Sequence, residues 1–360
     1  MALQRFMKNA VSEWMKGEGP HSDIMISSRI RIARNFRDIP FPMLATSSQA
    51  NEVIKRVHRA FQKIGTHRQL AGSELIRMDD LTELQRRVLV EKHLISPALA
   101  EESRQGAVIL SGSEAVSIMI NEEDHLRIQC LFPGLQLQEA WTLASELDDQ
   151  FEQELDFAFD EKRGYLTSCP TNVGTGVRAS VMVHLPALTM TQQIKRILPA
   201  VTQVGLAVRG IYGEGSEAVG SLFQISNQIT LGQSEREIVD KISSVALQIM
   251  HHEKKAREQL MNEARLKLED RVQRSLGILS HARVIDSKEA TERLSDLRLG
   301  IDLGLIKGVS STILNELMVM TQPGFLQQIA ERGLGSGERD VRRAQLIRER
   351  LAGERGAAEK

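Results

Sequence analysis

The sequence predicts an α+β domain followed by an all-helical C-terminal domain, because the residue pattern changes near residues 240–255. From about residue 20 to 235, stretches with the two-residue alternation of strands mix with helical stretches. Beyond that point the pattern is almost wholly helical, as in EKKAREQLMNEARLKLEDRVQRSL. We therefore predict an amphipathic helix over 1–20, an α+β domain over 21–250 and a helical domain over 251–360.

The first twenty residues are predicted to form an amphipathic helix and not a secretion signal. Their apolar residues recur at i, i+3, i+4 and i+7 with polar residues between them: Leu3, Phe6, Met7, Ala10, Val11, Trp14 and Met15. Such spacing places one apolar stripe against the protein, whereas a signal peptide needs a continuous apolar run.

Strand alternation in the α+β domain places apolar and basic residues on opposite faces. In DIMISSRIRIA, Arg29 and Arg31 point away from Ile24, Ile26, Ile30 and Ile32. In NEEDHLRIQCL, one face carries Leu126, Ile128 and Cys130, and the other carries Glu123, His125 and Arg127. In GVRASVMVHLP, the side of Arg178, Ser180, Met182 and His184 is opposite Val177, Ala179, Val181 and Val183.

Arginines recur on the polar faces of these strands, and Arg209 ends a further strand, VGLAVRG. If the strands belong to one sheet, five arginines converge on one surface: Arg29, Arg31, Arg127, Arg178 and Arg209. Guanidinium groups bind phosphate oxygens bidentately and stay protonated, so this surface suits a triphosphate. A solvated sheet face with scattered charges is the alternative that the pattern leaves open.

The segment CPTNVGTGVRAS at 169–180 combines glycines, threonines and a basic residue, as loops that hold phosphate through backbone amides do. It lacks the lysine of the G-x-x-x-x-G-K-[ST] loop. Cys169 opens the segment, while Cys130 falls on an apolar strand face and is predicted to be a core residue.

Composition restricts the class of protein further. The 360 residues include 46 basic and 47 acidic side chains, so no global charge attracts the chain to nucleic acid or membrane. Two cysteines are too few for a disulfide framework, which favours a reducing cytoplasm. No apolar run reaches the length of a bilayer span. We expect a soluble, cytoplasmic protein without direct nucleic-acid or membrane partners.

Four segments together resemble the phosphagen (guanidino) kinases, the family of creatine and arginine kinases. CPTNVGT is similar to their cysteine signature, SSRIR to their early arginine pair, and NEEDHLRIQ to their acidic strand. RGIYGEGSEAVGSLFQISN is similar to the loop after their last phosphate-binding arginine. The resemblance implies a catalytic domain with an antiparallel sheet flanked by helices, of the glutamine-synthetase-like type. It also implies ATP as the phosphate donor, with Mg²⁺ held mainly through the nucleotide phosphates and no dedicated protein metal site.

Two departures indicate one branch of that family. Only about twenty residues precede SSRIR, so we expect the small helical domain of the metabolite kinases to be missing. A helical C-terminal domain, which those kinases lack, follows instead. This layout resembles the bacterial protein arginine kinases. RDVRRA at 339–344 is similar to their phosphoarginine motif and implies a regulatory site at Arg339, Asp340, Arg343 and Ala344. A solvated charged helix is the alternative.

The resemblance also implies roles for single residues. Glu123 and Glu214 match the two carboxylates that hold the guanidinium and take up its proton, and Cys169 matches the cysteine beside it. The segments implied to hold ATP comprise Ser27, Ser28, Arg29, Ile30, Arg31, Arg127, Arg178, Ala179, Ser180, Val181, Met182, Arg209, Gly210, Ile211, Tyr212 and Gly213.

Three positions depart from the family pattern around the nucleotide. Leu110 and Met182 stand where the family has histidines, and Gln224 stands where it has an aspartate. His93 is our candidate for the adenine contact, and an ordinary surface or core histidine is the alternative.

We therefore expect an ATP-dependent kinase of arginine side chains in proteins. The family implies that it marks unfolded proteins for a Clp-type unfoldase, inactivates a heat-shock repressor and is activated allosterically by phosphoarginine. An activator protein and a homodimer are compatible with this expectation. A kinase of free arginine or another guanidino metabolite, and a non-catalytic phosphoarginine-binding adaptor, are the alternatives.

Overall fold

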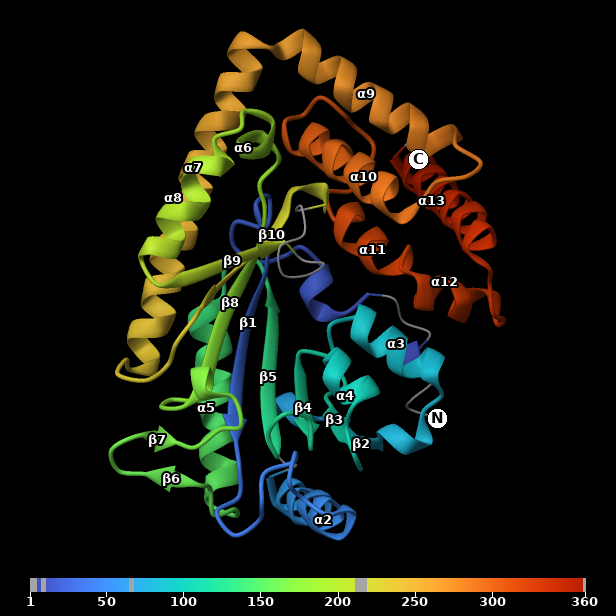
Figure 1. Cartoon of the computed structure of the whole chain (residues 1–360). Helices are drawn as coiled ribbons and strands as arrows, with labels where there is room; N and C mark the ends of the chain where they lie inside the picture. The colour runs from blue at the N-terminus through green and yellow to red at the C-terminus, as the bar shows by residue number, and fades with distance from the viewer. Residues whose placement is uncertain (1–4, 8–10, 65–67, 211–218, 359–360) are drawn as a thin grey trace.

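The protein is built around one eight-stranded sheet, and the computed structural model describes residues 5–7, 11–64, 68–210 and 219–358. The strands lie in the order β2-β3-β4-β5-β1-β8-β10-β9 with antiparallel neighbours (Figure 1). Their bounds are β1 Met25–Arg34, β2 Glu74–Arg77, β3 Ala107–Leu110, β4 Val116–Ile120, β5 Leu126–Pro133, β8 Val177–His184, β9 Leu206–Gly210 and β10 Leu222–Asn227. A small second sheet pairs β6 Phe159–Asp160 with β7 Gly164–Tyr165. The predicted α+β class is confirmed.

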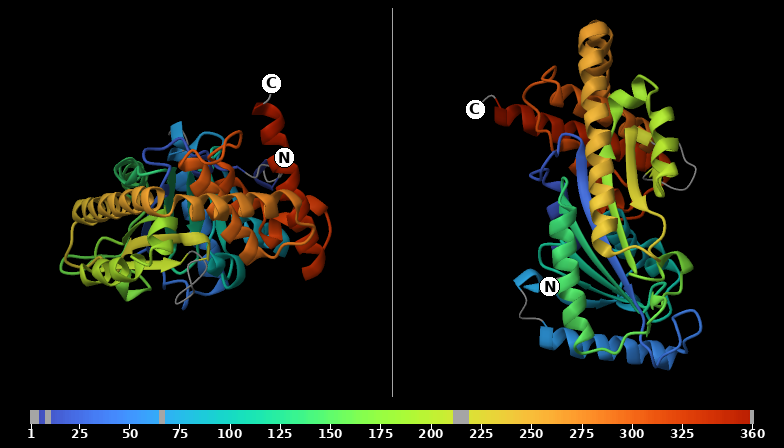
Figure 2. Two further views of the ribbon diagram at one scale, coloured as in Figure 1. Left: turned by 90° about the horizontal axis from the view of Figure 1, so that it is seen from above. Right: turned by 90° about the vertical axis from the view of Figure 1, so that its left-hand side faces the viewer.

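Helices cover one face of the sheet and close the first hydrophobic core. The main ones are α2 Ser47–Ile64, α5 Leu137–Glu152 and α8 Glu235–Glu263, and α5 and α8 run side by side in Figure 2. The shorter helices α6 Pro186–Met190 and α7 Ile194–Gln203 join β8 to β9. Residues that alternation assigned to the apolar faces of β5 and β8 are all in this core: Leu126, Ile128, Cys130, Val177, Ala179, Val181 and Val183.

A second core on the other side of the sheet joins three parts of the chain. It contains Trp14 from the N-terminal segment, Leu89 from α3 Glu83–Glu91, Met182 from β8 and Phe325 from the C-terminal helices. Those helices are α9 Arg265–His281, α10 Ser287–Asp302, α11 Ile313–Met320, α12 Pro323–Ala330 and α13 Ser336–Ala358. Figure 1 shows them grouped beside the sheet and next to α3. The helical C-terminal region is confirmed, and it shares a core with the sheet.

Short elements complete the described chain. The five-residue helix α4 Pro97–Glu101 follows α3. The 3₁₀ helices are η1 Glu13–Met15, η2 Arg68–Leu70, η3 Met78–Asp80, η4 Pro170–Asn172 and η5 Val219–Ser221.

The predicted division at residue 250 falls inside a helix. Helix α8 continues without a break through residue 250 to Glu263, and its N-terminal half packs in the first core through Ile238, Ile242 and Ala246. The helix ends at Ala264, whose φ of −138° is not helical, and α9 begins there in a new direction. Amphipathic spacing continues across both helices, so only the backbone at Ala264 reveals the division.

The N-terminal segment is buried, but its described residues do not form one helix. Val11 and Ser12 are not helical, and Ser12 has an extended backbone with φ −84° and ψ 164°. The Ser12 hydroxyl donates to the buried carboxylate of Glu114, which favours this extended conformation over a continued helix. Phe6 and Trp14 are nevertheless buried on the predicted apolar side.

A bulge in β1 changes one predicted side-chain direction. Met25 pairs with Val183 and Ser27 with Met182, so Ile26 is an extra residue in β1. Ile26 therefore packs in the second core and not with Ile30 in the first, contrary to the simple alternation.

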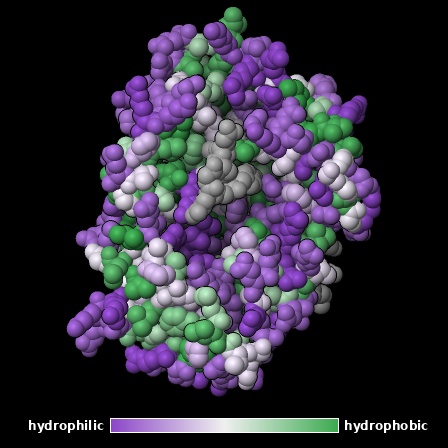
Figure 3. All heavy atoms as spheres, viewed as in Figure 1, coloured by the Kyte–Doolittle hydropathy of each residue, from purple (hydrophilic) through white to green (hydrophobic). Residues whose placement is uncertain are grey.

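The surface is largely hydrophilic on the face drawn in Figure 3, with apolar residues in separate patches. Among the helices that the structure describes, none has both the length and the apolar character needed to cross a membrane.

Candidate active site

Cross-strand pairing brings the five predicted arginines to one face of the sheet. Arg31 on β1 lies directly opposite Arg178 on β8, and Arg127 on β5 lies opposite Ala33 on β1. Arg209 on β9 is opposite Gln224 on β10, which in turn is opposite Met182 on β8. Opposed residues in an antiparallel sheet share a face, and so do residues two apart on a strand. The predicted convergence of the arginines is thus present in the structure.

The arginine cluster is electrostatically unfavourable while it faces no anion. Burial, together with the charges of Arg127 and Arg178, lowers the pKa of Arg29 to about 10, which still leaves it charged at neutral pH. Burial and the neighbouring arginines lower the pKa of Arg31 well below its usual range, and burial lowers that of Arg178. The buried Nε of Arg31 has no hydrogen-bond partner among the described residues. A polyphosphate would satisfy this donor and offset the repulsion.

A cavity of about 520 Å³ adjoins the arginine face. Its polar lining includes Arg29, Arg31, Gln129 and Gln224. Apolar side chains from the sheet and the helices form much of the rest: Val90, Ile95, Pro97, Met119, Met182 and Met318. A cavity of this size with both cationic and apolar lining suits a nucleotide, because its phosphates are anionic and the faces of its base are apolar.

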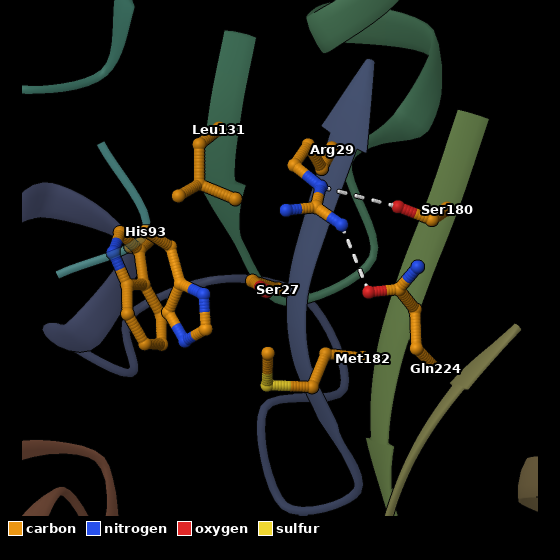
Figure 4. A pocket seen from close by; sticks show the side chains of 8 residues that line it. Ser27, Arg29, His93, Leu131, Ser180, Met182 and Gln224 are labelled. Atoms are coloured by element: carbon orange, nitrogen blue, oxygen red, sulfur yellow. Dashed lines mark hydrogen bonds between the residues drawn. The ribbon is translucent and has the colours of Figure 1, made fainter. Parts of the chain in front are cut away.

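Arg29 is held in place between two strands of the sheet. Its Nη2 donates to Gln224 Oε1 at 2.8 Å and its Nε to Ser180 Oγ at 3.4 Å (Figure 4). Ser27 and Met182 lie around it in the small pocket of Figure 4. Gln224, which departs from the family pattern, therefore orients an arginine that faces the cavity.

His93 lies at this cavity, where the sequence prediction placed a nucleotide contact. Burial and the charge of Arg29 lower its pKa to about 4, so the imidazole is neutral at neutral pH. Its ring meets Trp14 edge to face with centroids 5.5 Å apart. Leu110 is fully buried in the second core, away from the residues that line the cavity. A neutral imidazole beside the cavity is compatible with an adenine contact.

Carboxylates and a thiol lie at the edge of the arginine face. Arg127 donates to Glu122 at 2.6 Å and to Glu123 at 3.3 Å. The Glu123 side chain is 38% exposed while that of Glu122 is 3% exposed, so Glu123 is the carboxylate that a substrate can reach. Burial raises the pKa of Glu123 although Arg127 opposes the shift, which favours a carboxylate able to take up a proton.

The cysteine loop is folded onto the same edge. Cys169 Sγ lies 3.1 Å from Thr171 Oγ1, which also accepts from Arg178 at 3.3 Å. The Ser168 hydroxyl donates to the backbone oxygen of Glu123 at 2.7 Å. The loop thus connects Cys169 with both Arg178 of the arginine face and the backbone of Glu123. Predicted site residues Ile211, Tyr212, Gly213 and Glu214 lie outside the described residues, whereas Gly210 ends β9.

Four predicted nucleotide residues point to the opposite face of the sheet. Ile30, Ala179 and Val181 are fully buried in the first core. The buried hydroxyl of Ser28 donates to the Gly134 carbonyl and accepts from the Gln136 amide. Successive side chains of a strand point to opposite faces, and each of these four residues is next to one that lies on the arginine face. Their side chains therefore stabilise the strands that carry the arginines and do not face the cavity.

The acidic segment contains a hydrogen-bond network that sequence reasoning missed. Alternation placed His125 on the arginine face, but it precedes β5 and is fully buried. His125 Nδ1 accepts from the Phe36 amide at 3.0 Å, so the neutral ring carries its proton on Nε2, 3.1 Å from the Pro40 carbonyl. Asp124 accepts from Asn35 at 2.6 Å and from the Ser168 amide at 2.7 Å. The clustering of Asp, Glu and His in NEEDH was the only sequence signal of this network.

The C-terminal motif is placed differently from the prediction. Arg343 is 2% exposed, and its guanidinium donates to the carbonyls of Thr321 and Ile285 and to Asp340. Ala344 is buried beside it, and Arg339 donates to the Leu334 carbonyl. Arg343 therefore joins α13 to the end of α11 in this structure, and it does not present a phosphate-binding group to solvent.

A positive sheet face of this kind serves to bind polyphosphate, and an accessible carboxylate beside a thiol suits a cationic acceptor. These features suit a phosphoryl transferase that acts on a cationic acceptor.

Comparison with known protein families extends this conclusion. Residues 52–256 match the family of the ATP:guanido phosphotransferase C-terminal catalytic domain, and residues 265–360 match the protein-arginine kinase McsB C-terminal domain. The chain is 64% identical over 353 residues to the protein-arginine kinase of Halalkalibacterium halodurans, with 98% of each chain covered. It is 58% identical over 354 residues to that of Bacillus subtilis, with 98% of this chain and 96% of the relative covered. The chain belongs to the protein-arginine kinases.

Solved structures support the fold. Lombricine kinase superposes with a TM-score of 0.56 at 23% identity, covering 69% of this chain and 70% of that one. The duplicated taurocyamine kinase of Schistosoma mansoni gives 0.58 at 21% identity, covering 74% of this chain and 38% of that one. The predicted phosphagen-kinase fold is therefore confirmed.

Proposed function

We propose that this enzyme transfers the γ-phosphate of ATP to the guanidinium of arginine side chains in proteins, with the residues described above in the roles that follow. The observation that carries the proposal is the shared sheet face. Its arginines border a nucleotide-sized cavity at one end, and Glu123 and Cys169 lie at its edge.

The arginines bind and align the triphosphate. Arg29 and Arg31 face the cavity, while Arg127, Arg178 and Arg209 continue the same positive surface across the sheet. Phosphoryl transfer mainly requires alignment and stabilisation of charge on the equatorial oxygens, and fixed guanidinium groups supply both. Mg²⁺ belongs to the proposal as an ion held mainly through the nucleotide phosphates.

The carboxylates prepare the acceptor. A guanidinium has a pKa above about 12 and is a poor nucleophile while it is protonated. Glu123 holds it and takes one proton, with Glu214 as the proposed second carboxylate and Cys169 beside the guanidinium. The nitrogen lone pair then forms the N–P bond as the bond from the γ-phosphorus to the bridging oxygen breaks, and ADP leaves.

The wider role belongs to the same proposal. Phosphorylated proteins are marked for a Clp-type unfoldase, and a heat-shock repressor is inactivated in the cytoplasm. Phosphoarginine activates the enzyme at Arg339, Asp340, Arg343 and Ala344; since Arg343 is engaged with two carbonyls, binding there requires α13 to release them. An activator protein and a second copy of the chain are further partners.

Labelling with ATP tests the proposal. We expect acid-labile phosphate on an unfolded protein, with kcat lowered at least about 100-fold in Glu123→Gln because proton transfer and orientation are lost. Glu139→Gln, at an exposed position on α5, is the matched control and keeps the wild-type rate. Label on free arginine alone would instead support a metabolite kinase, and no label on either acceptor would support the adaptor.

A further inference from the structure

Two large apolar side chains are exposed together in the segment between β1 and α2. Met43 is 79% exposed and Leu44 is 81% exposed. They lie on a tight turn in which the Leu44 and Ala45 amides both donate to the Phe41 carbonyl, at 2.8 and 3.0 Å. Single exposed apolar residues are common, but an adjacent pair on an ordered turn indicates a contact surface.

This turn borders a cavity that also contains the proposed acceptor carboxylate. The cavity is about 550 Å³, and Pro42 and Met43 line one part of it. Glu102, Glu122 and Glu123 also line this cavity, with Arg104. Arg127 pairs with both Glu122 and Glu123, but the Glu123 side chain remains 38% exposed. It can therefore accept a further guanidinium, and an apolar side chain next to that guanidinium would reach Pro42 and Met43.

The buried network of the acidic segment holds the turn in position. His125 Nδ1 accepts a hydrogen bond from the Phe36 amide, and His125 Nε2 donates to the Pro40 carbonyl. These two contacts hold both ends of the loop that leads into the turn. The Phe41 ring also meets the His125 ring edge to face at 6.3 Å. Glu123 is two residues from His125, so one short segment supplies the acceptor carboxylate and fixes the apolar turn relative to it.

We propose that Met43 and Leu44 form a docking subsite for an apolar side chain adjacent to the acceptor arginine in an unfolded protein segment. The inference rests on the proposed function, because it requires the acceptor guanidinium at Glu123. In folded proteins, large apolar side chains are mostly buried, whereas unfolded segments expose them beside arginines. The subsite therefore selects unfolded proteins through sequence-local apolar contacts.

A pair of peptides tests the subsite. They have equal length and charge and one arginine each, flanked by leucines in the first peptide and by serines in the second. We expect the wild-type enzyme to phosphorylate the leucine peptide with about tenfold higher kcat/KM, from partial burial of a leucine. In Met43→Ser/Leu44→Ser this ratio falls toward one, while the KM for ATP stays at the wild-type value because the turn does not line the nucleotide cavity.

Leu266→Ser is the matched control. Leu266 is also 79% exposed but lies on α9, so its replacement keeps the tenfold ratio. Equal rates for both peptides with the wild-type enzyme, or an unchanged ratio in the double variant, would overturn the subsite. The subsite would also be overturned if the double variant kept the peptide ratio but changed the oligomeric state in sedimentation. That result would assign the turn to contact with a second copy of the chain. Label on free arginine and on neither peptide would contradict the proposed function itself.

Discussion

At the scale of single residues, burial favours the neutral form of three histidines. Burial lowers the pKa of His93 and His125 to about 4 and that of His184 well below its usual range. His184 is fully buried, with its Nε2 2.8 Å from the Ser295 hydroxyl of α10. Each of these histidines therefore connects the sheet, or the loops beside it, to a neighbouring part of the molecule.

His125 makes stability depend on pH with a defined sign. Its folded pKa of about 4 lies below the unfolded value of 6.5, so the unfolded chain binds more protons between these pH values. The contribution of His125 is complete above pH 6.5 and is lost as the pH falls toward 4. The stabilisation that is lost over this range corresponds to at most about 3 kcal/mol.

We expect the difference in unfolding free energy between the wild type and His125→Asn to shrink over this pH range. Urea unfolding of both proteins from pH 7.5 to 4.5 measures the difference and cancels the other titrating groups. A difference that grows on acidification would contradict the neutral tautomer.

At the scale of elements, glycines in the CPTNVGTGVRAS segment allow the chain to enter β8 close to β1. Gly176 has a φ of +68°, and a Cβ there would lie 2.6 Å from the Ala33 carbonyl oxygen of β1. At Gly174, which has a φ of +113°, a Cβ would lie 2.9 Å from the Cα of Leu231. The arginine two residues after Gly176 is Arg178, so this close approach sets the position of a side chain that we propose binds phosphate.

We expect Gly176→Ala to lower kcat about tenfold, because a clash with β1 displaces Arg178 from alignment with the phosphates. Gly232→Ala is the control: its φ is +79°, but nothing lies within 4 Å of the added Cβ. Both variants place an alanine in the left-handed conformation, which costs about 1–2 kcal/mol. A difference in kcat between them in steady-state kinetics therefore reports the displacement of Arg178 and not this backbone strain. Equal rates in the two variants would refute the role of the close approach.

At the scale of the whole molecule, a largely buried glutamate connects the C-terminal region to the cavity beside the arginine face. Glu91 at the end of α3 accepts from the amides of Gly324 and Phe325 at the start of α12, at 2.7 and 2.9 Å. Glu91 also lines the cavity, together with Gln322 just before α12. The next residue back is Thr321, whose carbonyl accepts from Arg343 of α13. A continuous set of contacts thus runs from α13 to the cavity wall.

We expect Glu91→Ala to lower the free energy of unfolding by about 2 kcal/mol, because two buried amides lose their acceptor. Gly324→Ala acts from the other side, since its Cβ would lie 2.8 Å from Glu91 Oε2. The controls are Glu101→Ala, at an exposed position on α4, and Gly277→Ala, which has nothing within 4 Å. Denaturant midpoints measure all four variants, and loss of stability only in the controls would contradict the connection.

Sequence by itself determined the family, the α+β class and the identity of the five arginines. Strand alternation is a local property, and so the apolar faces of β5 and β8 could be predicted from spacing alone. The convergence of the arginines was expected only if their strands belong to one sheet, because pairing across the sheet joins residues as distant in sequence as Arg31 and Arg178.

Only the tertiary structure decided what depends on contacts between distant segments. The bulge at Ile26, the burial of His125 against Phe36 and the division of the helices at Ala264 interrupt local periodicity without changing composition. Arg343 looks like a solvated or phosphate-binding charge in sequence, yet it is buried and donates to two backbone carbonyls of other segments, those of Thr321 and Ile285. The physical reason is that burial and hydrogen-bond satisfaction belong to pairs of segments, whereas residue spacing describes one segment at a time.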